Sequence, residues 1–135
     1  FYEGKILAGF AGAVADAMAL FEKFEGKLTE VNGNLQKAVV EMAKEWRTDK
    51  ILKDLDALLA IMDNKSAYLL SGSGDVIEPD GQVISIGSGS GYAVAAARAY
   101  LDAGEKDPST IVNKALQITA DICIYTNDNI TILKA

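Results

Sequence analysis

The sequence contains no histidine and only one cysteine among its 135 residues. Histidine is the commonest general base and a frequent metal ligand, so its absence excludes Ser-His-Asp and Cys-His catalysis and histidine-ligated zinc. A lone cysteine, Cys123, cannot form a disulfide within the chain, and no basic segment leads into an apolar, signal-like stretch. These absences exclude many classes of enzyme and favour a protein that works in the reducing cytoplasm.

Long apolar runs and basic clusters are also lacking. The longest apolar runs, 57–62 and 92–97, fall far short of the roughly 20 residues that cross a bilayer. The net charge is −6, and no Lys or Arg stripe suited to a phosphate backbone is present. Half of the residues are hydrophobic and 24% are charged, as in ordinary globular proteins. The composition predicts a single domain over residues 1–135, with no membrane and no nucleic acid as a partner.

Apolar periodicity predicts mainly helices in the first half of the chain. A strand is expected at 5–10, a helix from Gly12, and a second helix after the break at 32–34, so that the two helices form an antiparallel pair. Beyond a second break at 47–49, residues 51–59 carry a further apolar face, which gives two or three helices in all. The expected inner faces have apolar residues three, four and seven apart: Val14, Met18, Phe21, Phe24 (or Ala19) and Leu28, then Leu35, Val39, Met42 and Trp46.

The second half of the chain alternates strands and helices. Short strands are expected at 66–71, 76–77 and 83–86, as an antiparallel meander, and at 130–133. Helices are expected at 92–103 and from Asp107-Pro108, where Asp suits the N-cap and Pro the first helical position. The last helix should bury a face of four residues: Ile111, Ala115, Ile118 and Ile122. This order predicts an α+β fold with helices packed on sheet faces.

Several long segments resemble the HslV family, the peptidase subunits of the two-component HslUV proteases and bacterial relatives of the proteasome β subunit. The resemblance covers essentially the whole chain. It is carried by AGFAGAVADA (8–17) with MALFEKFEGKL (18–28), by KEWRTDK (44–50), by ISIGSGSGYAVAAARA (84–99) and by ADICIYTN (120–127). Without this resemblance, a small ligand-binding α+β domain would remain an alternative.

The resemblance implies an amino-terminal-nucleophile hydrolase fold, a four-layer αββα sandwich that is missing its first strands here. In this family an amino-terminal threonine attacks the peptide carbonyl and its own α-amino group is the general base, a chemistry that needs no histidine. The family's Thr, Asp and Lys lie on early strands that have no counterpart in these residues. Internal Thr29 and Thr48 cannot replace the nucleophile, so the chain as written is expected to be inactive. The alternative is an inactive truncated relative that keeps only its assembly surfaces.

Three residues could support the reaction according to the resemblance. Gly12, and less securely Gly9, would present a backbone N–H to the oxyanion at the start of a helix, where N–H groups are unpaired. From the residues alone, either glycine could simply permit a tight turn. Ser88 matches a serine that lies beside the nucleophile in the family, although it could equally cap the following helix.

A monovalent cation site is also implied. Ala120, Cys123 and Thr126 have the spacing at which the family offers backbone carbonyls to a sodium ion, with Ala120 where glycine is usual. The Cys123 side chain itself is expected to be a small buried hydrophobe. The glycine-rich segment 87–91 does not predict nucleotide binding, because Tyr92 stands where the last glycine of G-x-G-x-x-G belongs, so no ATP is expected on this subunit.

The partners follow from the resemblance as well. It implies allosterically controlled, stacked hexameric peptidase rings in the cytoplasm, with a hexameric AAA+ ATPase ring (HslU) that delivers unfolded protein substrates.

Overall fold

The computed structural model describes residues 3–55 and 57–135. The chain forms two compact units, Phe1–Asp80 with Ala135 (unit 1) and Gly81–Lys134 (unit 2), and each is described by itself. Among the residues described, no helix is long and apolar enough to cross a membrane. The prediction of one domain over 1–135 stays a prediction.

Unit 1 contains an antiparallel sheet with the strand order β1-β2-β3-β4. The strands are β1 (Leu7–Gly12), β2 (Ala57–Met62), β3 (Ala67–Ser71) and β4 (Val76–Ile77). In the register of the first pair, Leu7 lies opposite Met62 and Gly12 opposite Ala57. The tight connection from β2 to β3 is fixed by Asp63, whose Oδ1 accepts the N–H groups of Lys65 and Ser66 at 2.8 Å each.

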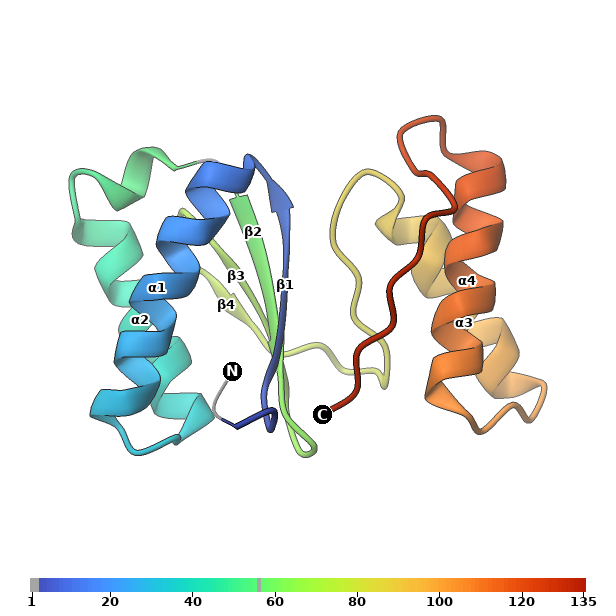
Figure 1. The fold of residues 1–135 in the computed structure, drawn as a ribbon, viewed down its shortest axis with the longest axis horizontal. Coiled ribbons are helices and arrows are strands. Elements are labelled where there is room, and N and C mark those ends of the chain that lie inside the picture. The colour runs from blue at the N-terminus through green and yellow to red at the C-terminus, as the bar shows by residue number, and fades with distance from the viewer. Residues whose placement is uncertain (1–2, 56) are drawn as a thin grey trace. The chain divides into compact units, whose positions relative to one another are not determined.

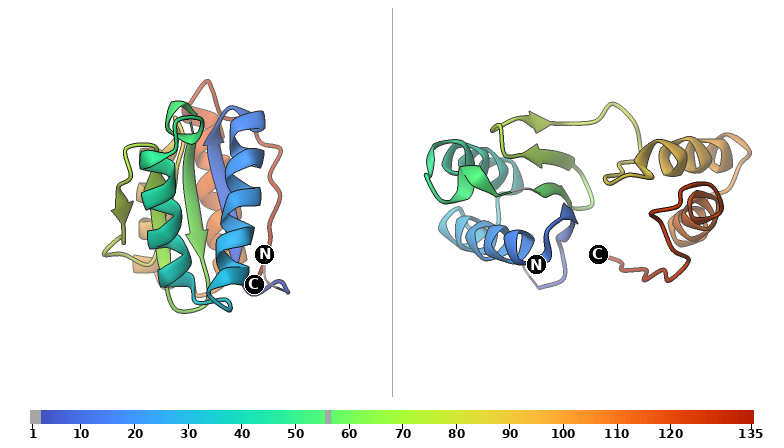
Figure 2. Two further views of the ribbon diagram at one scale, coloured as in Figure 1. Left: turned by 90° about the vertical axis from the view of Figure 1, so that its left-hand side faces the viewer. Right: turned by 90° about the horizontal axis from the view of Figure 1, so that it is seen from above.

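Two helices, α1 (Val14–Glu30) and α2 (Leu35–Thr48), cover one face of this sheet (Figures 1 and 2), and the short 3₁₀ helix η1 (Leu52–Asp54) leads into β2. The chain turns between α1 and α2 at Asn32 and Gly33, which have φ of 54° and 78°. Asn34 then caps α2 by accepting the Lys37 N–H at 3.1 Å. The core between the layers consists of large apolar side chains, including Leu20, Phe24, Leu28, Val39, Met42, Trp46, Leu59, Ile61 and Leu70.

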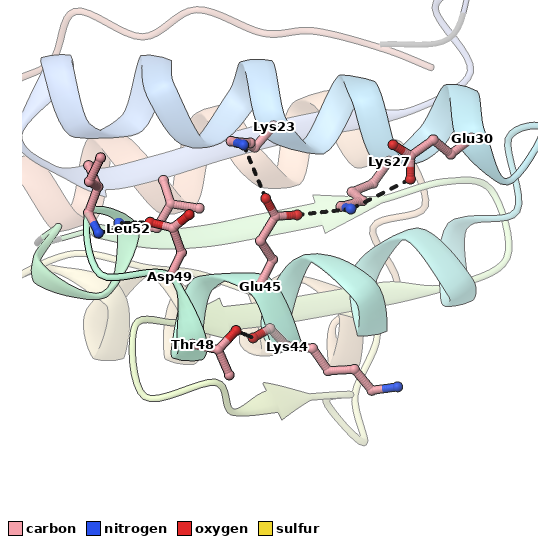
Figure 3. Close-up of polar contacts among 9 residues, drawn as sticks. Lys23, Lys27, Glu30, Lys44, Glu45, Thr48, Asp49 and Leu52 are labelled. Carbon is pink, nitrogen blue, oxygen red and sulfur yellow. Dashed lines mark hydrogen bonds and ion pairs between the residues drawn. The ribbon is translucent and has the colours of Figure 1, made fainter.

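An ion-pair cluster joins the outer surfaces of α1 and α2 (Figure 3). Glu45 of α2 accepts from Lys23 Nζ at 3.1 Å and lies 2.9 Å from Lys27 Nζ, both on α1. Lys27 also reaches Glu30 at 3.5 Å. The bond to Lys27, followed by that to Lys23, lowers the pKa of Glu45, while the bond to Glu45 raises the pKa of Lys27.

Unit 2 is built on two packed helices, α3 (Ser90–Asp102) and α4 (Pro108–Ile122). Asp107 is the N-cap of α4 with Pro at the start of the helix, as predicted, and the Thr110 hydroxyl donates to Asp107 Oδ2 at 2.7 Å. The buried centre of this pair consists of Ala97, Ile111 and Ala115. Two of these three side chains are small alanines, which favours close packing of the two helices.

The α+β class, the strands at 67–71 and 76–77, the helix pairs and the buried face of α2 are confirmed. The helical prediction for the end of 51–59 is wrong, because residues 57–62 form the second strand of the sheet. There Ala57, Leu59 and Ile61 are buried, whereas Leu58 between them is 43% exposed, which is the alternation of a half-buried strand. The first strand is also shifted by two residues, to Leu7–Gly12.

The predicted inner face of α1 is partly wrong. Val14 and Met18 are 66% and 53% exposed, and the buried residues are Ala17, Leu20, Phe24 and Leu28. Ala17 and Leu20 are buried in place of the predicted Met18 and Phe21, one residue further along, whereas Phe24 and Leu28 are buried as predicted. In α4, Ile111 and Ala115 are buried as predicted, but Thr119 takes the place expected for Ile118 and Ile122.

Two predicted strands, 83–86 and 130–133, are irregular segments. A strand is stable only when a neighbour completes its hydrogen bonds. Within the described chain, no ladder includes either segment, so their alternating apolar residues do not produce regular strands here.

Candidate functional site

Gly12 lies at the connection from β1 to α1, directly before the amino-terminal end of a helix. Gly12 ends β1 with a φ of 132°, a backbone angle that residues with a side chain rarely adopt. Ala13 is the N-cap of α1, and its side chain makes no capping hydrogen bond. The first N–H groups of a helix have no partners within it and lie at its positive end. This geometry is compatible with oxyanion stabilisation, which for Gly12 stays a prediction.

Gly9 does not flank this turn, contrary to the sequence interpretation. It lies inside β1 opposite Ala60, three residues before the strand ends. A Cβ at Gly9 would meet nothing within 4 Å. The packing therefore gives no reason for a glycine at this position.

Ser88 lies in the turn that leads into α3. Gly87 has a φ of 103°, and its carbonyl accepts the Ser90 N–H at 3.1 Å. The N-cap of α3 is Gly89, so the interpretation of Ser88 as the helix cap is wrong. Ser88 instead accepts a hydrogen bond from the Cys123 thiol, with 3.8 Å between Oγ and Sγ.

The end of α4 contains the three residues predicted to bind a cation. Ala120 lies in the last turn of α4, Cys123 is the C-cap, and the Thr126 N–H donates to the Cys123 carbonyl at 3.1 Å. Ala120 is not among the described residues with positive φ, so its backbone conformation does not require glycine. Carbonyls at a helix carboxyl end carry partial negative charge, and oxygen ligands suit a hard cation. Backbone carbonyls are thus a type of ligand that suits a sodium ion, and its binding at these three residues stays a prediction.

Cys123 is buried, at 8% exposure, as its apolar interpretation predicted. The hydrogen bond with the Thr126 hydroxyl, followed by that with the Tyr125 N–H, lowers the pKa of its thiol, and the contact with Ser88 acts in the same direction. The side chain is therefore also part of a polar contact that joins Ser88 to the end of α4.

Unit 2 thus brings together Ser88, Cys123 and Thr126, whereas Gly9 and Gly12 belong to unit 1. Sequence reasoning missed Gly89 and Thr119, which lie at the same junction. The only sequence signal for them is the glycine repeat at 87–91 and a threonine on the otherwise apolar face of α4. Among the described residues, no group of three or more Cys, Asp or Glu side chains could hold a metal ion, so carbonyl oxygens are the candidate ligands.

Comparison with known proteins identifies the family. The sequence pattern of the proteasome subunit family matches residues 2–135. The ATP-dependent protease subunit HslV of Caldicellulosiruptor saccharolyticus is 56% identical over 133 residues, which are 98% of this chain and 76% of that protein. HslV of Geobacillus sp. WCH70 is also 56% identical, over 97% of this chain and 74% of that protein.

Solved structures agree with this result. The crystal structure of HslV from Trypanosoma brucei matches with a TM-score of 0.86 at 42% identity, over 92% of this chain and 72% of that chain. The amino-terminal-nucleophile hydrolase fold expected from the sequence is thereby confirmed. The structure of Thiobacillus denitrificans BPH in complex with epoxomicin matches with a TM-score of 0.66 at 16% identity, a likeness of fold alone.

Proposed function

Since this chain belongs to the proteasome subunit family, we propose that it is part of the peptidase subunit of an ATP-dependent protease of the threonine type. The observation that carries this proposal is the 56% identity to HslV proteins along 98% of the chain. The absence of histidine from the sequence is compatible with a threonine whose own amino group is the base.

In the proposed mechanism, the amino-terminal threonine hydroxyl attacks the peptide carbonyl and its proton passes to the α-amino group. The negative charge that develops on the carbonyl oxygen is stabilised by backbone N–H groups at the β1–α1 connection, with Gly12 as the preferred donor. Gly9 is the weaker candidate, because it lies inside a strand. Ser88 supports the nucleophile through its hydroxyl. Internal threonines such as Thr29 and Thr48 are not candidate nucleophiles, because their backbone nitrogens are held in peptide bonds and supply no free α-amino base. Both of their hydroxyls donate to helix carbonyls.

A sodium ion held by the carbonyls of Ala120, Cys123 and Thr126 would stabilise the loop after α4. This part of the proposal is supported by the donor chemistry and by the position of the three residues at a helix carboxyl end. The ion would supply positive charge to a turn whose carbonyls repel one another.

The partners proposed are further copies of the subunit in stacked hexameric rings, an AAA+ ATPase ring (HslU) and unfolded proteins that it delivers in the cytoplasm. The support is the name of the relatives, which are subunits of ATP-dependent proteases. ATP binding is assigned to the partner ring and not to this chain.

The experiment that tests the proposal is amino-terminal sequencing and intact mass measurement of the native protein, with a fluorogenic peptide assay on the same sample. We expect a chain heavier than 14.3 kDa that begins with threonine and cleaves peptide. Replacement of that threonine by alanine should abolish cleavage. A native chain of 14.3 kDa that begins at Phe1 and shows no cleavage would replace the proposal with an inactive relative.

A further inference from the structure

Gly89 lies where the start of α3 meets the end of α4, and there is no space for a side chain. A Cβ at this position would lie 2.5 Å from Thr119 Cγ2 and 2.9 Å from Thr126 Oγ1. Ordinary van der Waals contacts of a Cβ begin near 3.4 Å, so the first overlap is close to 1 Å. The φ of Gly89 is −93°, which any residue adopts, so the close approach and not the backbone conformation requires glycine here.

The neighbour that makes the closest contact is fixed in place. Thr119 is 1% exposed, and its hydroxyl donates to the Ala115 carbonyl at 2.8 Å. Because Thr119 is buried, rotation about χ1 would disturb this hydrogen bond or press the methyl group into the surrounding packed atoms, and either is costly. The overlap must therefore be relieved by a shift of the backbone.

The residues next to these contacts are the ones with predicted roles. Ser88 precedes Gly89, and its Oγ accepts from the Cys123 thiol at 3.8 Å. Cys123 and Thr126 belong to the turn whose carbonyls are the candidate cation ligands. A shift at Gly89 would move the Ser88 turn away from this carbonyl turn.

We propose that Gly89 is a positioning residue that lets the Ser88 turn lie directly on the last turn of α4, so that the supporting serine and the cation-binding turn are placed as one rigid piece. The inference rests on the proposed function for the roles of Ser88 and the carbonyl turn, whereas the packing itself does not depend on that function.

The test in the native subunit is Gly89→Ala, with Gly91→Ala as the matched control. Gly91 lies in the first turn of the same helix, and a Cβ there would meet nothing within 4 Å. Because a displacement of about 1 Å at a catalytic group can cost on the order of 100-fold, we expect G89A to lower kcat by roughly 10- to 100-fold. KM should change by less than about twofold, since no substrate-binding group is altered, and G91A should match the wild type.

A second variant separates positioning from general misfolding. Thr119→Ser removes the methyl group that overlaps but keeps the hydroxyl that donates to Ala115. The G89A/T119S variant should recover part of the lost kcat, or recover folding if G89A alone fails to fold. The remaining overlap is with Thr126, a partly exposed side chain that can move at the cost of its weak bond to the Cys123 thiol. If T119S restores neither activity nor folding to G89A, the proposed packing role of Gly89 is wrong.

An independent measurement is the rate at which a small neutral reagent alkylates Cys123, followed at that residue by mass spectrometry. At about pH 9.5 most cysteine thiols are ionised, so the rate reports access to the sulfur. Cys123 is 8% exposed, and separation of the two turns should raise the rate severalfold in G89A but not in G91A. An unchanged rate in G89A overturns the inference even if the protein is a peptidase. A wild-type protein without peptidase activity overturns the proposed function and leaves the alkylation result to decide on the packing.

Discussion

Each of the two units of this chain has its own kind of core packing. Unit 1 buries large side chains, such as Phe24, Trp46 and Leu59, between a helix pair and a sheet. Unit 2 has a small buried centre of Ala97, Ile111 and Ala115, and its helices are close enough to leave no room for a Cβ at Gly89. Buried side-chain volume therefore stabilises the first unit, whereas the second packs around small residues, with the Gly89 backbone directly against the Thr119 and Thr126 side chains. The comparison predicts that unit 1 is sensitive to loss of volume and unit 2 to its addition.

The largest effect is expected from Phe24→Ala in unit 1. Phe24 is fully buried between α1 and the sheet, so its truncation removes apolar contacts and leaves a cavity. The loss should be about 3–5 kcal/mol in the free energy of unfolding, measured by urea denaturation. Val14→Ala in the same helix, where the side chain is 66% exposed, should change this free energy by less than about 0.5 kcal/mol. Equal effects of the two substitutions would contradict the assignment of the buried face of α1.

An intermediate effect is expected when volume is added to unit 2 by Ala97→Leu. Ala97 is 3% exposed and packs between α3 and α4, so a larger side chain must push the helices apart. Overpacking of this kind costs about 1–3 kcal/mol, measurable as a lower urea midpoint. Ala95→Leu, at an exposed position of α3, is the control and should be nearly neutral. A stable A97L protein would mean that the interface of α3 and α4 is looser than the structure has it.

The two glycines of β1 offer a sharper comparison within one strand. Gly12 has a φ of 132°, so Gly12→Ala introduces strain of about 1–3 kcal/mol. Gly9→Ala should be tolerated, because a Cβ at that position meets nothing within 4 Å. Thermal unfolding of both variants, with peptide cleavage as a second readout, tests whether Gly12 alone is required at this connection. Comparable losses in G9A would point instead to a role for the whole strand.

The sequence predicted best those elements whose signals are local. The buried face of α2 and the Asp107-Pro108 helix start follow from periodicity and capping, and both are observed. The strand at 57–62 was missed because its apolar residues continue a helix-like spacing from residue 51. Its pairing with β1 joins residues about fifty positions apart, and no local pattern contains that information.

The candidate site was predicted only through resemblance to a family. Nothing in the chemistry of Ala120 or Ser88 singles them out, because their roles would depend on a backbone carbonyl and on a neighbour from another element. Gly89 and Thr119 are thirty residues apart in the sequence. Only the packed structure shows that the Thr119 methyl group leaves no space for a side chain at position 89. Such pairwise fit is a property of tertiary packing rather than of sequence pattern.

The smallest effect, and the one that varies with pH, is expected from Glu45→Gln on the surface of unit 1. The bonds from Lys27 and Lys23 lower the pKa of Glu45, so the ionised form is favoured in the folded state. A lowered folded-state pKa contributes stability that is present above the unfolded-state value of about 4.3 and is lost as the pH falls through the folded-state pKa. The side chains of Glu45 and Lys27 are 26% and 21% exposed, so we expect the variant to lose only about 0.5–1 kcal/mol near neutral pH.

Urea unfolding of the wild type and E45Q between pH 7 and pH 3 measures this difference directly, and it should shrink toward zero at the acidic end. At the alkaline end, stability changes with pH in the opposite direction. The raised pKa of Lys27 contributes stability that is lost only as the pH rises above about 10.4. The matched control is Glu41→Gln, which removes an exposed pair with Lys44 within α2 alone. If E41Q and E45Q lose equal stability with equal pH dependence, the ion pairs between α1 and α2 add nothing to the apolar core, and unit 1 is held by buried volume alone.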